Sequence, residues 1–274
     1  MSGSAKYLRP VDGFAGGIPY FRIGTGPPMV FLAPLAESFG GWQRRYQIRY
    51  LNPLLRFSTI YVFAGMPTLP AGTTMAAEIA ARYAGAVTEL FAEPVDVMGA
   101  STGGSLALQL GVDHPELVKR LIVIAAAPRL SALGRSATAS CAELVAEGRP
   151  AAGFRQLSPL TAGSSVGRFF VGLGLMLGAA LTRAGQGSAG RLVATVLKAE
   201  VGFDVRSRVG ELAMPVLVIA GRKDTCYDHA DCRDLAVRAP RCPASSSTSR
   251  PRGVVADRRI WSRVIPFLGT QSSS

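Results

Sequence analysis

Short apolar runs alternate with segments of helical period along most of the 274-residue sequence. The runs are MVFLA at residues 29–33, TIYVFA at 59–64, VDVMG at 95–99, LIVIAAA at 121–127 and PVLVIAG at 215–221. Continuous apolar runs of this length are typical of strands covered on both faces, as in parallel sheets. Between them, residues 73–91 and the segment after residue 103 have apolar residues at helical spacing. The alternation predicts an α/β fold with a doubly wound, mostly parallel sheet.

Two regions depart from this rhythm. The glycines and prolines of YFRIGTGPP (residues 20–28) indicate a turn that leaves an antiparallel N-terminal hairpin. Residues 128–209 are rich in Gly and Ala, helical in period and without a convincing strand. We expect residues 128–209 to form a helical lid, or cap, inserted into a core made of residues 1–127 and 210–274.

Composition and charge narrow the class of protein. Hydrophobic residues make up 48% of the chain and the net charge is +12, with all but four of the 30 basic residues being arginine. The arginines are scattered and form no stripe interleaved with aromatic residues, so we expect no nucleic-acid partner. We interpret the charge as the codon bias of a GC-rich genome.

A few sequence features bear on the cellular location of the protein and on its need for a metal or cofactor. The N-terminus has no apolar core of the kind found in signal peptides, which favours a cytoplasmic protein. The apolar run at residues 169–181 is shorter than the roughly 20 residues that a spanning helix needs, although it leaves peripheral membrane contact open. Four cysteines, with no metal-ligand spacing, predict free thiols, no metal and no cofactor.

The segment Gly99-Ala100-Ser101-Thr102-Gly103 matches the G-x-S-x-G pattern of a serine nucleophile held on a strand-to-helix turn. The small residues around Ser101 suit a turn in which a helix crosses close to a strand. The alternative interpretation is a glycine-rich helix start at which Ser101 is the N-cap.

Four features in order resemble the α/β-hydrolase fold superfamily, over roughly residues 19–268: GASTGG, the earlier strand PPMVFLAPL, the run DHPELVKRLIVIAAAP and PVLVIAGRKD. The resemblance implies that Ser101 is the nucleophile and that the N–H groups of Thr102 and Leu35 form an oxyanion hole. It also implies that Asp224, after a strand and a turn, is the carboxylate that orients the catalytic histidine. Where the family usually has His-Gly before the second oxyanion donor, this chain has Ala33-Pro34.

The histidine itself is missing from the place where the resemblance puts it. The loop before the last helix (VVADRRIWSRVIPFL) contains Pro251-Arg252-Gly253, and arginine does not accept a proton near neutrality. The chain has only two histidines. His114 is expected near the opposite end of the sheet from Ser101, and His229, at a helix start after Asp224, is the remaining candidate base.

The segment CPASSSTSRPR, residues 242–252, stands where the last strand is expected and is rich in Ser instead of Val. If it is written in GC-rich codons and read two nucleotides later, it encodes a Val-rich segment typical of a buried strand. A compensated frame shift is therefore an alternative explanation for the missing base.

These observations predict a serine hydrolase that acts on an ester or related acyl substrate with an apolar acyl group, a small-molecule partner. The apolar lid residues that suggest such a substrate are Phe169, Phe170, Leu173, Leu175, Met176 and Leu177. The alternative is a catalytically impaired protein of the same fold that binds an apolar ligand or partner.

Overall fold

The computed structural model describes residues 9–34, 41–63, 75–161, 187–222, 224–239, 246–248 and 258–269. Within these residues, eight strands form one sheet in the order β1-β2-β4-β3-β5-β6-β7-β8. Their bounds are β1 Val11–Ala15, β2 Ile18–Gly24, β3 Pro28–Leu32, β4 Thr59–Phe63, β5 Val95–Ala100, β6 Val118–Ile124, β7 Val216–Gly221 and β8 Ser246–Thr248. β1 and β2 pair as an antiparallel hairpin, β2 is antiparallel to β4, and every other pair is parallel. The predicted doubly wound, mostly parallel sheet is confirmed.

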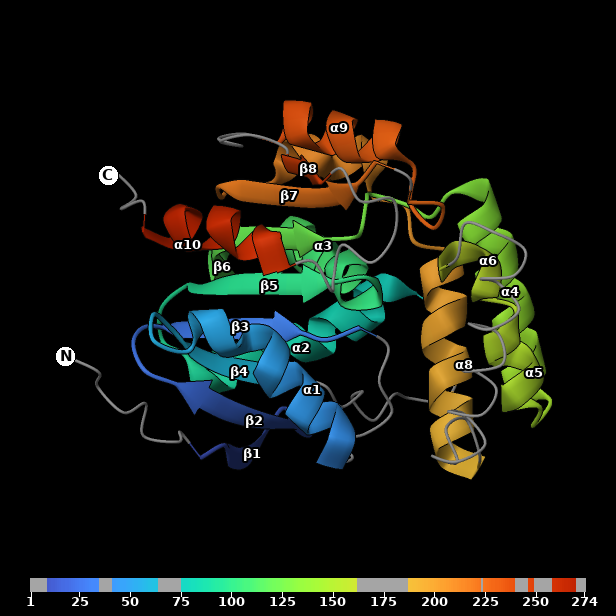
Figure 1. The fold of residues 1–274 in the computed structure, drawn as a ribbon, viewed down its shortest axis with the longest axis horizontal. Helices are drawn as coiled ribbons and strands as arrows, with labels where there is room; N and C mark the ends of the chain where they lie inside the picture. Colours follow the sequence, from blue (N-terminus) through green and yellow to red (C-terminus); the bar gives the residue numbers. More distant parts are fainter. Residues whose placement is uncertain are drawn as a thin grey trace.

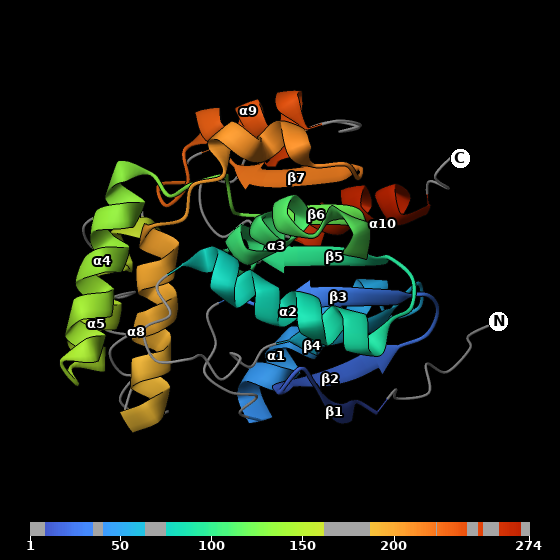
Figure 2. The ribbon, with the colours of Figure 1, turned by 180° about the vertical axis from the view of Figure 1, so that it is seen from behind.

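Helices cover both faces of this sheet (Figures 1 and 2). The helices against the sheet are α1 Gly41–Leu51, α2 Ala76–Leu90, α3 Thr102–Asp113, α9 His229–Arg238 and α10 Trp261–Gly269. α2, α3 and α9 contribute to one apolar core and α10 to a second core on the other face. Short 3-10 helices are η1 Asn52–Leu54, η2 Pro115–Leu117, η3 Arg206–Glu211 and η5 Arg258–Ile260. The sequence pattern follows from this layering, because strands buried on both faces need continuous apolar runs.

A separate group of helices lies beyond the carboxyl ends of the parallel strands (Figure 1). Its members are α4 Ala132–Ala146, α5 Pro150–Arg155, α6 Ser158–Thr161 and α8 Gly187–Val201. α4 packs along α8 through a small apolar core of its own. The chain leaves the sheet for these helices and returns from them at adjacent points. The N–H of Val205, on the return, donates to the carbonyl of Pro128, on the way out, at 2.9 Å.

The strand β8 forms from the serine-rich segment. Ser246, Ser247 and Thr248 pair in parallel with the end of β7. The remainder of residues 242–252 lies outside the described residues. The last helix begins later than its pattern suggests, since α10 starts at Trp261 after the short helix η5.

The expectations of free cysteines and of no membrane-spanning helix can be compared with the described residues only. Cys141, Cys226 and Cys232 are free, whereas Cys242 lies outside the described residues. None of the described helices has the length and apolar character of a membrane span. The apolar run at residues 169–181 is not among the described residues.

A buried ion pair links the sheet to the C-terminal helix. Arg120 of β6 donates two hydrogen bonds to Asp96 of β5, at 2.7 and 2.8 Å, and its third nitrogen donates to the carbonyls of Phe267 and Leu268 in α10. The Arg120 and Asp96 side chains are only 10% and 6% exposed. A pair of buried charges is tolerated only with such complete hydrogen bonding.

We predict that Arg120→Met lowers the free energy of unfolding by about 3–5 kcal/mol, because it leaves the Asp96 carboxylate buried without its cation. Adding Asp96→Asn should recover part of the loss, since a neutral amide is less costly to bury. Arg149→Met is the control, because the Arg149–Glu147 pair is 62% and 58% exposed and should contribute less than about 1 kcal/mol. Urea unfolding measures all three, and equal losses for Arg120 and Arg149 would contradict the prediction.

Candidate active site

Ser101 occupies the sharp turn between β5 and α3. Its backbone has φ 53° and ψ −129°, in a region that residues other than glycine rarely adopt. The N–H of Ser101 donates to the carbonyl of Ile124 in β6 at 2.9 Å, and the Ser101 carbonyl accepts from the N–H groups of Gly104 and Ser105. The Ser101 hydroxyl makes no capping bond to α3, and the residue is partly exposed. Ser101 is therefore not an N-cap of the ordinary kind, and its strained turn holds a hydroxyl that the helix does not use.

Glycines allow α3 to lie against the strands at this turn. A Cβ on Gly103 would lie 2.1 Å from the carbonyl oxygen of Leu32 in β3, and one on Gly99 would lie 2.2 Å from the carbonyl oxygen of Gly103. A Cβ on Gly104 would lie 2.6 Å from the Cβ of Ala126. The first two contacts are to backbone atoms, which cannot move aside as a flexible side chain would.

Of the two expected oxyanion donors, Thr102 and Leu35, only Thr102 is among the described residues. Thr102 is the first residue of α3, where backbone N–H groups have no acceptor within the helix. Leu35 lies outside the described residues. The end of β3 passes beside Gly103, so the chain that leads to Leu35 starts next to the Ser101 turn.

Asp224 follows β7 by three residues and is partly buried. One of its carboxylate oxygens accepts hydrogen bonds from the N–H groups of Cys226 and Tyr227, at 2.8 and 3.2 Å. These bonds fix the orientation of the carboxylate within its own turn. β7 and β5 are both parallel to β6, so Asp224 and Ser101 follow strand ends at the same edge of the sheet.

The structure does not join either histidine to Ser101. His114 caps the C-terminal end of α3, about 18 Å along the helix from its start, and its ring lies 3.6 Å from Glu116. His229 is the first residue of α9, and its Nδ1 is buried without a hydrogen-bond partner. No hydrogen bond between described residues connects the His229 ring with Ser101 or Asp224. Arg252 and the loop around it are outside the described residues.

A buried carboxyl group that the sequence analysis missed lies next to the Ser101 turn. Glu200, near the end of α8, is 6% exposed. Its Oε2 accepts from Thr102 Oγ1 at 2.9 Å, and its Oε1 accepts from Tyr227 Oη at 2.7 Å and from Ser105 Oγ at 3.3 Å. Burial raises the pKa of Glu200, while the three hydroxyl donors act in the opposite direction. The hydroxyls of Ser105 and Tyr227 are 3.0 Å apart.

A sequence signal for Glu200 was available. Val193, Val196 and Leu197 are buried on one face of α8, and Glu200 follows Val193 by seven residues and Val196 by four. Residues at these spacings share a helix face. A carboxylate on an otherwise apolar face needs hydrogen-bond partners from elsewhere in the fold.

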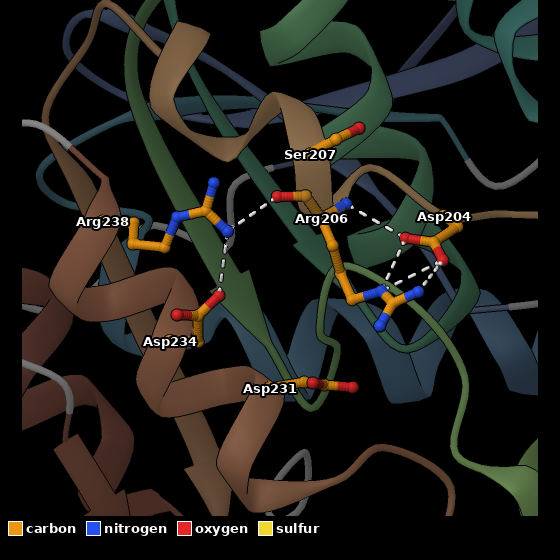
Figure 3. Close-up of a pocket in the computed structure, with 6 residues that line it drawn as sticks. All are labelled: Asp204, Arg206, Ser207, Asp231, Asp234 and Arg238. Carbon is orange, nitrogen blue, oxygen red and sulfur yellow. Dashed lines mark hydrogen bonds and ion pairs between the residues drawn. The ribbon is translucent and has the colours of Figure 1, made fainter.

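A hollow of about 440 Å³ lies between η3 and α9 (Figure 3), and Ser101 and its neighbours in sequence are not among the residues that line it. It is lined by Asp204, Arg206, Ser207, Asp231, Asp234 and Arg238. Arg206 pairs with Asp204 at 2.7 Å, and Arg238 pairs with Asp234 at 3.1 Å and donates to the Arg206 carbonyl. Both arginines in this hollow already have carboxylate partners, so we interpret it as a contact between η3 and α9.

Comparison with solved structures identifies the fold. An α/β-hydrolase enzyme from a Medee basin deep-sea metagenome library superposes with a TM-score of 0.74 at 15% identity, covering 93% of this chain and 95% of the other. The chain has the α/β-hydrolase fold. An enol-lactonase from Burkholderia xenovorans (TM-score 0.71, 16% identity, 95% and 100% coverage) and a carboxylesterase from Bacillus subtilis (0.67, 14%, 97% and 94%) share it. The sequence matches no model of a protein family and no curated protein.

The close approach of α3 to β3 predicts opposite effects for two helical glycines. Gly103→Ala should lower the free energy of unfolding by about 3 kcal/mol, because its Cβ would overlap the Leu32 carbonyl. Gly85→Ala, in α2, has no atom within 4 Å of the added Cβ. It should stabilise the protein by about 0.5–1 kcal/mol, because alanine favours the helix. Chemical denaturation measures both, and a stable Gly103→Ala variant would refute the close packing.

The raised pKa of Glu200 predicts how stability changes with pH. The folded state favours the protonated carboxyl, so this favourable contribution is complete below the unfolded pKa of about 4.3 and is lost as pH rises through the folded pKa. Glu200→Gln has no such titration. The free energy of unfolding of the wild type, minus that of Glu200→Gln, should therefore fall as pH increases from about 4 to about 8.

The neighbours of Glu200 do not reverse this sign. Burial also raises the pKa values of Tyr227 and Cys226, so both stay neutral over this pH range. Glu143→Gln, on the exposed face of α4, is the control and should follow the wild type at every pH. A difference between wild type and Glu200→Gln that is constant or rises with pH would contradict the prediction.

Proposed function

We propose that this protein is a serine hydrolase that acts on an ester or related acyl substrate with an apolar acyl group. Ser101 would attack the acyl carbonyl, and the N–H groups of Thr102 and Leu35 would stabilise the resulting oxyanion. Asp224 would orient the base. The observation that supports this most strongly is the strained Ser101 turn at the carboxyl edge of the sheet, with a hydroxyl that does not cap α3.

We further propose that residues 128–209 act as a lid on a core of residues 1–127 and 210–274. The described helices of this segment lie beyond the carboxyl edge of the sheet, on the side to which β5 points (Figure 2). The hydrogen bond between Val205 and Pro128 closes the base of the insertion, which suits a segment that moves as a unit. The apolar residues that suggest an apolar acyl group belong to residues 162–186, outside the described part of the chain.

The second candidate is a catalytically impaired protein of this fold that binds an apolar ligand. It is favoured by the His229 ring, which has a buried, unpartnered Nδ1 and no bond to Ser101. Arg252, where the family resemblance expects histidine, cannot serve as a base. Loss of the base in a serine protease triad lowers kcat by about six orders of magnitude and leaves residual catalysis from the oxyanion hole and binding.

Reactivity of Ser101 separates these candidates. We expect a fluorophosphonate probe to label the wild type and not Ser101→Ala, because the probe reacts with an activated serine hydroxyl. Intact mass and peptide mapping measure the labelling. Equal labelling of both proteins would remove Ser101 from the mechanism.

Ester hydrolysis by wild type, Ser101→Ala and His229→Ala then tests the base. We expect slow turnover that depends on Ser101 and not on His229. Fast turnover that requires both residues would make His229 the base. Sequencing the gene across codons 242–253 tests the frame-shift alternative, since a Val-rich strand followed by Gly-His would supply the missing histidine.

A further inference from the structure

The carboxyl group of Glu200 meets two segments that are far from it in sequence. Glu200 belongs to the helix group beyond the sheet, whereas Thr102 and Ser105 belong to the first turn of α3 and Tyr227 to the turn after β7. All four residues are at least nine-tenths buried. A single side chain from α8 therefore contacts both the Ser101 turn and the Asp224 turn.

At the Ser101 turn, Glu200 contacts two residues that follow the strained Ser101. Thr102 directly follows Ser101, and its hydroxyl donates to Glu200 at 2.9 Å. The Ser105 N–H donates to the Ser101 carbonyl, while the Ser105 hydroxyl donates to Glu200. Glu200 thus restrains both ends of the helical turn whose first N–H groups face the proposed oxyanion.

On the acid side, the contact leads to Asp224. The Tyr227 hydroxyl donates to Glu200 at 2.7 Å, and the Tyr227 N–H donates to the Asp224 carboxylate at 3.2 Å. A chain of hydrogen bonds therefore runs from α8 through Tyr227 to the residue that is expected to orient the base.

We propose that Glu200 is a positioning residue that holds the Ser101 turn and the Asp224 turn in register with α8. This inference rests on the proposed function of Ser101. A non-glycine residue in the Ser101 conformation costs about 1–3 kcal/mol and persists only where its surroundings restrain it. Glu200 supplies such a restraint from the lid segment, so departure of α8 would loosen both turns together.

The chemistry of the cluster argues against simple packing. Leucine or valine would fill this position on the apolar face of α8 without the cost of burying a carboxyl group. Instead three hydroxyls, from Thr102, Ser105 and Tyr227, converge on the two carboxyl oxygens. Directional bonds of this kind fix geometry, which dispersion contacts alone do less well.

The test compares four variants of the full chain. Glu200→Leu removes both acceptor oxygens, Glu200→Gln keeps one, and Tyr227→Phe removes one donor. Val193→Ala is the control, because it trims a buried side chain on the same face of α8 without touching the hydroxyls. Two quantities are measured: the rate constant for fluorophosphonate labelling of Ser101, and amide hydrogen exchange in the peptides covering residues 99–106 and 222–230.

We expect Glu200→Leu to be labelled at least about tenfold more slowly than Val193→Ala, because small displacements of a reacting group have large effects on rate. Glu200→Gln should recover most of the rate. Exchange should rise in both peptides in Glu200→Leu and Tyr227→Phe but not in Val193→Ala. Labelling of Glu200→Leu at the Val193→Ala rate, or unchanged exchange in either peptide, would overturn the proposal.

Two further outcomes remain informative. If Glu200→Leu does not fold, Tyr227→Phe decides, and wild-type behaviour in both measurements overturns the proposal. If the wild type is not labelled, the proposed function fails. The exchange data then still decide whether Glu200 couples the two turns.

Discussion

The approach of α3 to β3 and β5 is the contact on which the rest of the molecule depends. Backbone meets backbone at Gly99 and Gly103, where even a methyl group would overlap a carbonyl oxygen. Because α3 lies this close, the chain must turn within one residue between β5 and the helix. That residue is Ser101, and its positive φ follows from the packing. The position of its hydroxyl at the carboxyl edge is therefore a consequence of the core.

Two buried carboxyl groups are accommodated in different ways. Asp96 faces the guanidinium of Arg120, which also binds carbonyls of α10 and so joins the sheet to the C-terminal helix. Glu200 has hydroxyl partners and no cation among them, so burial raises its pKa. The ion pair is suited to a permanent core contact. The hydroxyl cluster joins the core to α8, which lies beyond the carboxyl edge of the sheet.

The fold and the catalytic chemistry are separate questions. An α/β-hydrolase fold presents a nucleophile, an acid and oxyanion donors at one edge of the sheet, but a fold does not by itself determine function. In this chain the strained Ser101 turn lies at that edge, whereas neither histidine is hydrogen-bonded to Ser101. The proposed activity therefore depends on one proton acceptor, which is a property of a single loop and not of the architecture.

Much of the fold could be predicted from local patterns. The apolar runs predicted β3, β4, β5, β6 and β7, and the G-x-S-x-G pattern predicted the turn at Ser101. Burial on two faces and a tight crossing of helix and strand each require a recognisable pattern within a few consecutive residues. Helix α1 has no such local pattern in its sequence. It is largely polar, and Tyr50 holds it through ring contacts with Phe31 and Trp261 from other elements.

The sequence by itself thus determined the layered α/β architecture, the Ser101 turn and the lack of a histidine at the expected position. The tertiary structure decided that Glu200 meets Thr102, from which it is separated by 98 residues, and that the His229 ring makes no bond to Ser101. It also decided that a serine-rich segment pairs with β7. The physical reason is that periodicity and turn chemistry act over a few residues. Hydrogen bonds between distant segments and the pairing of an edge strand depend instead on which elements the completed core brings together.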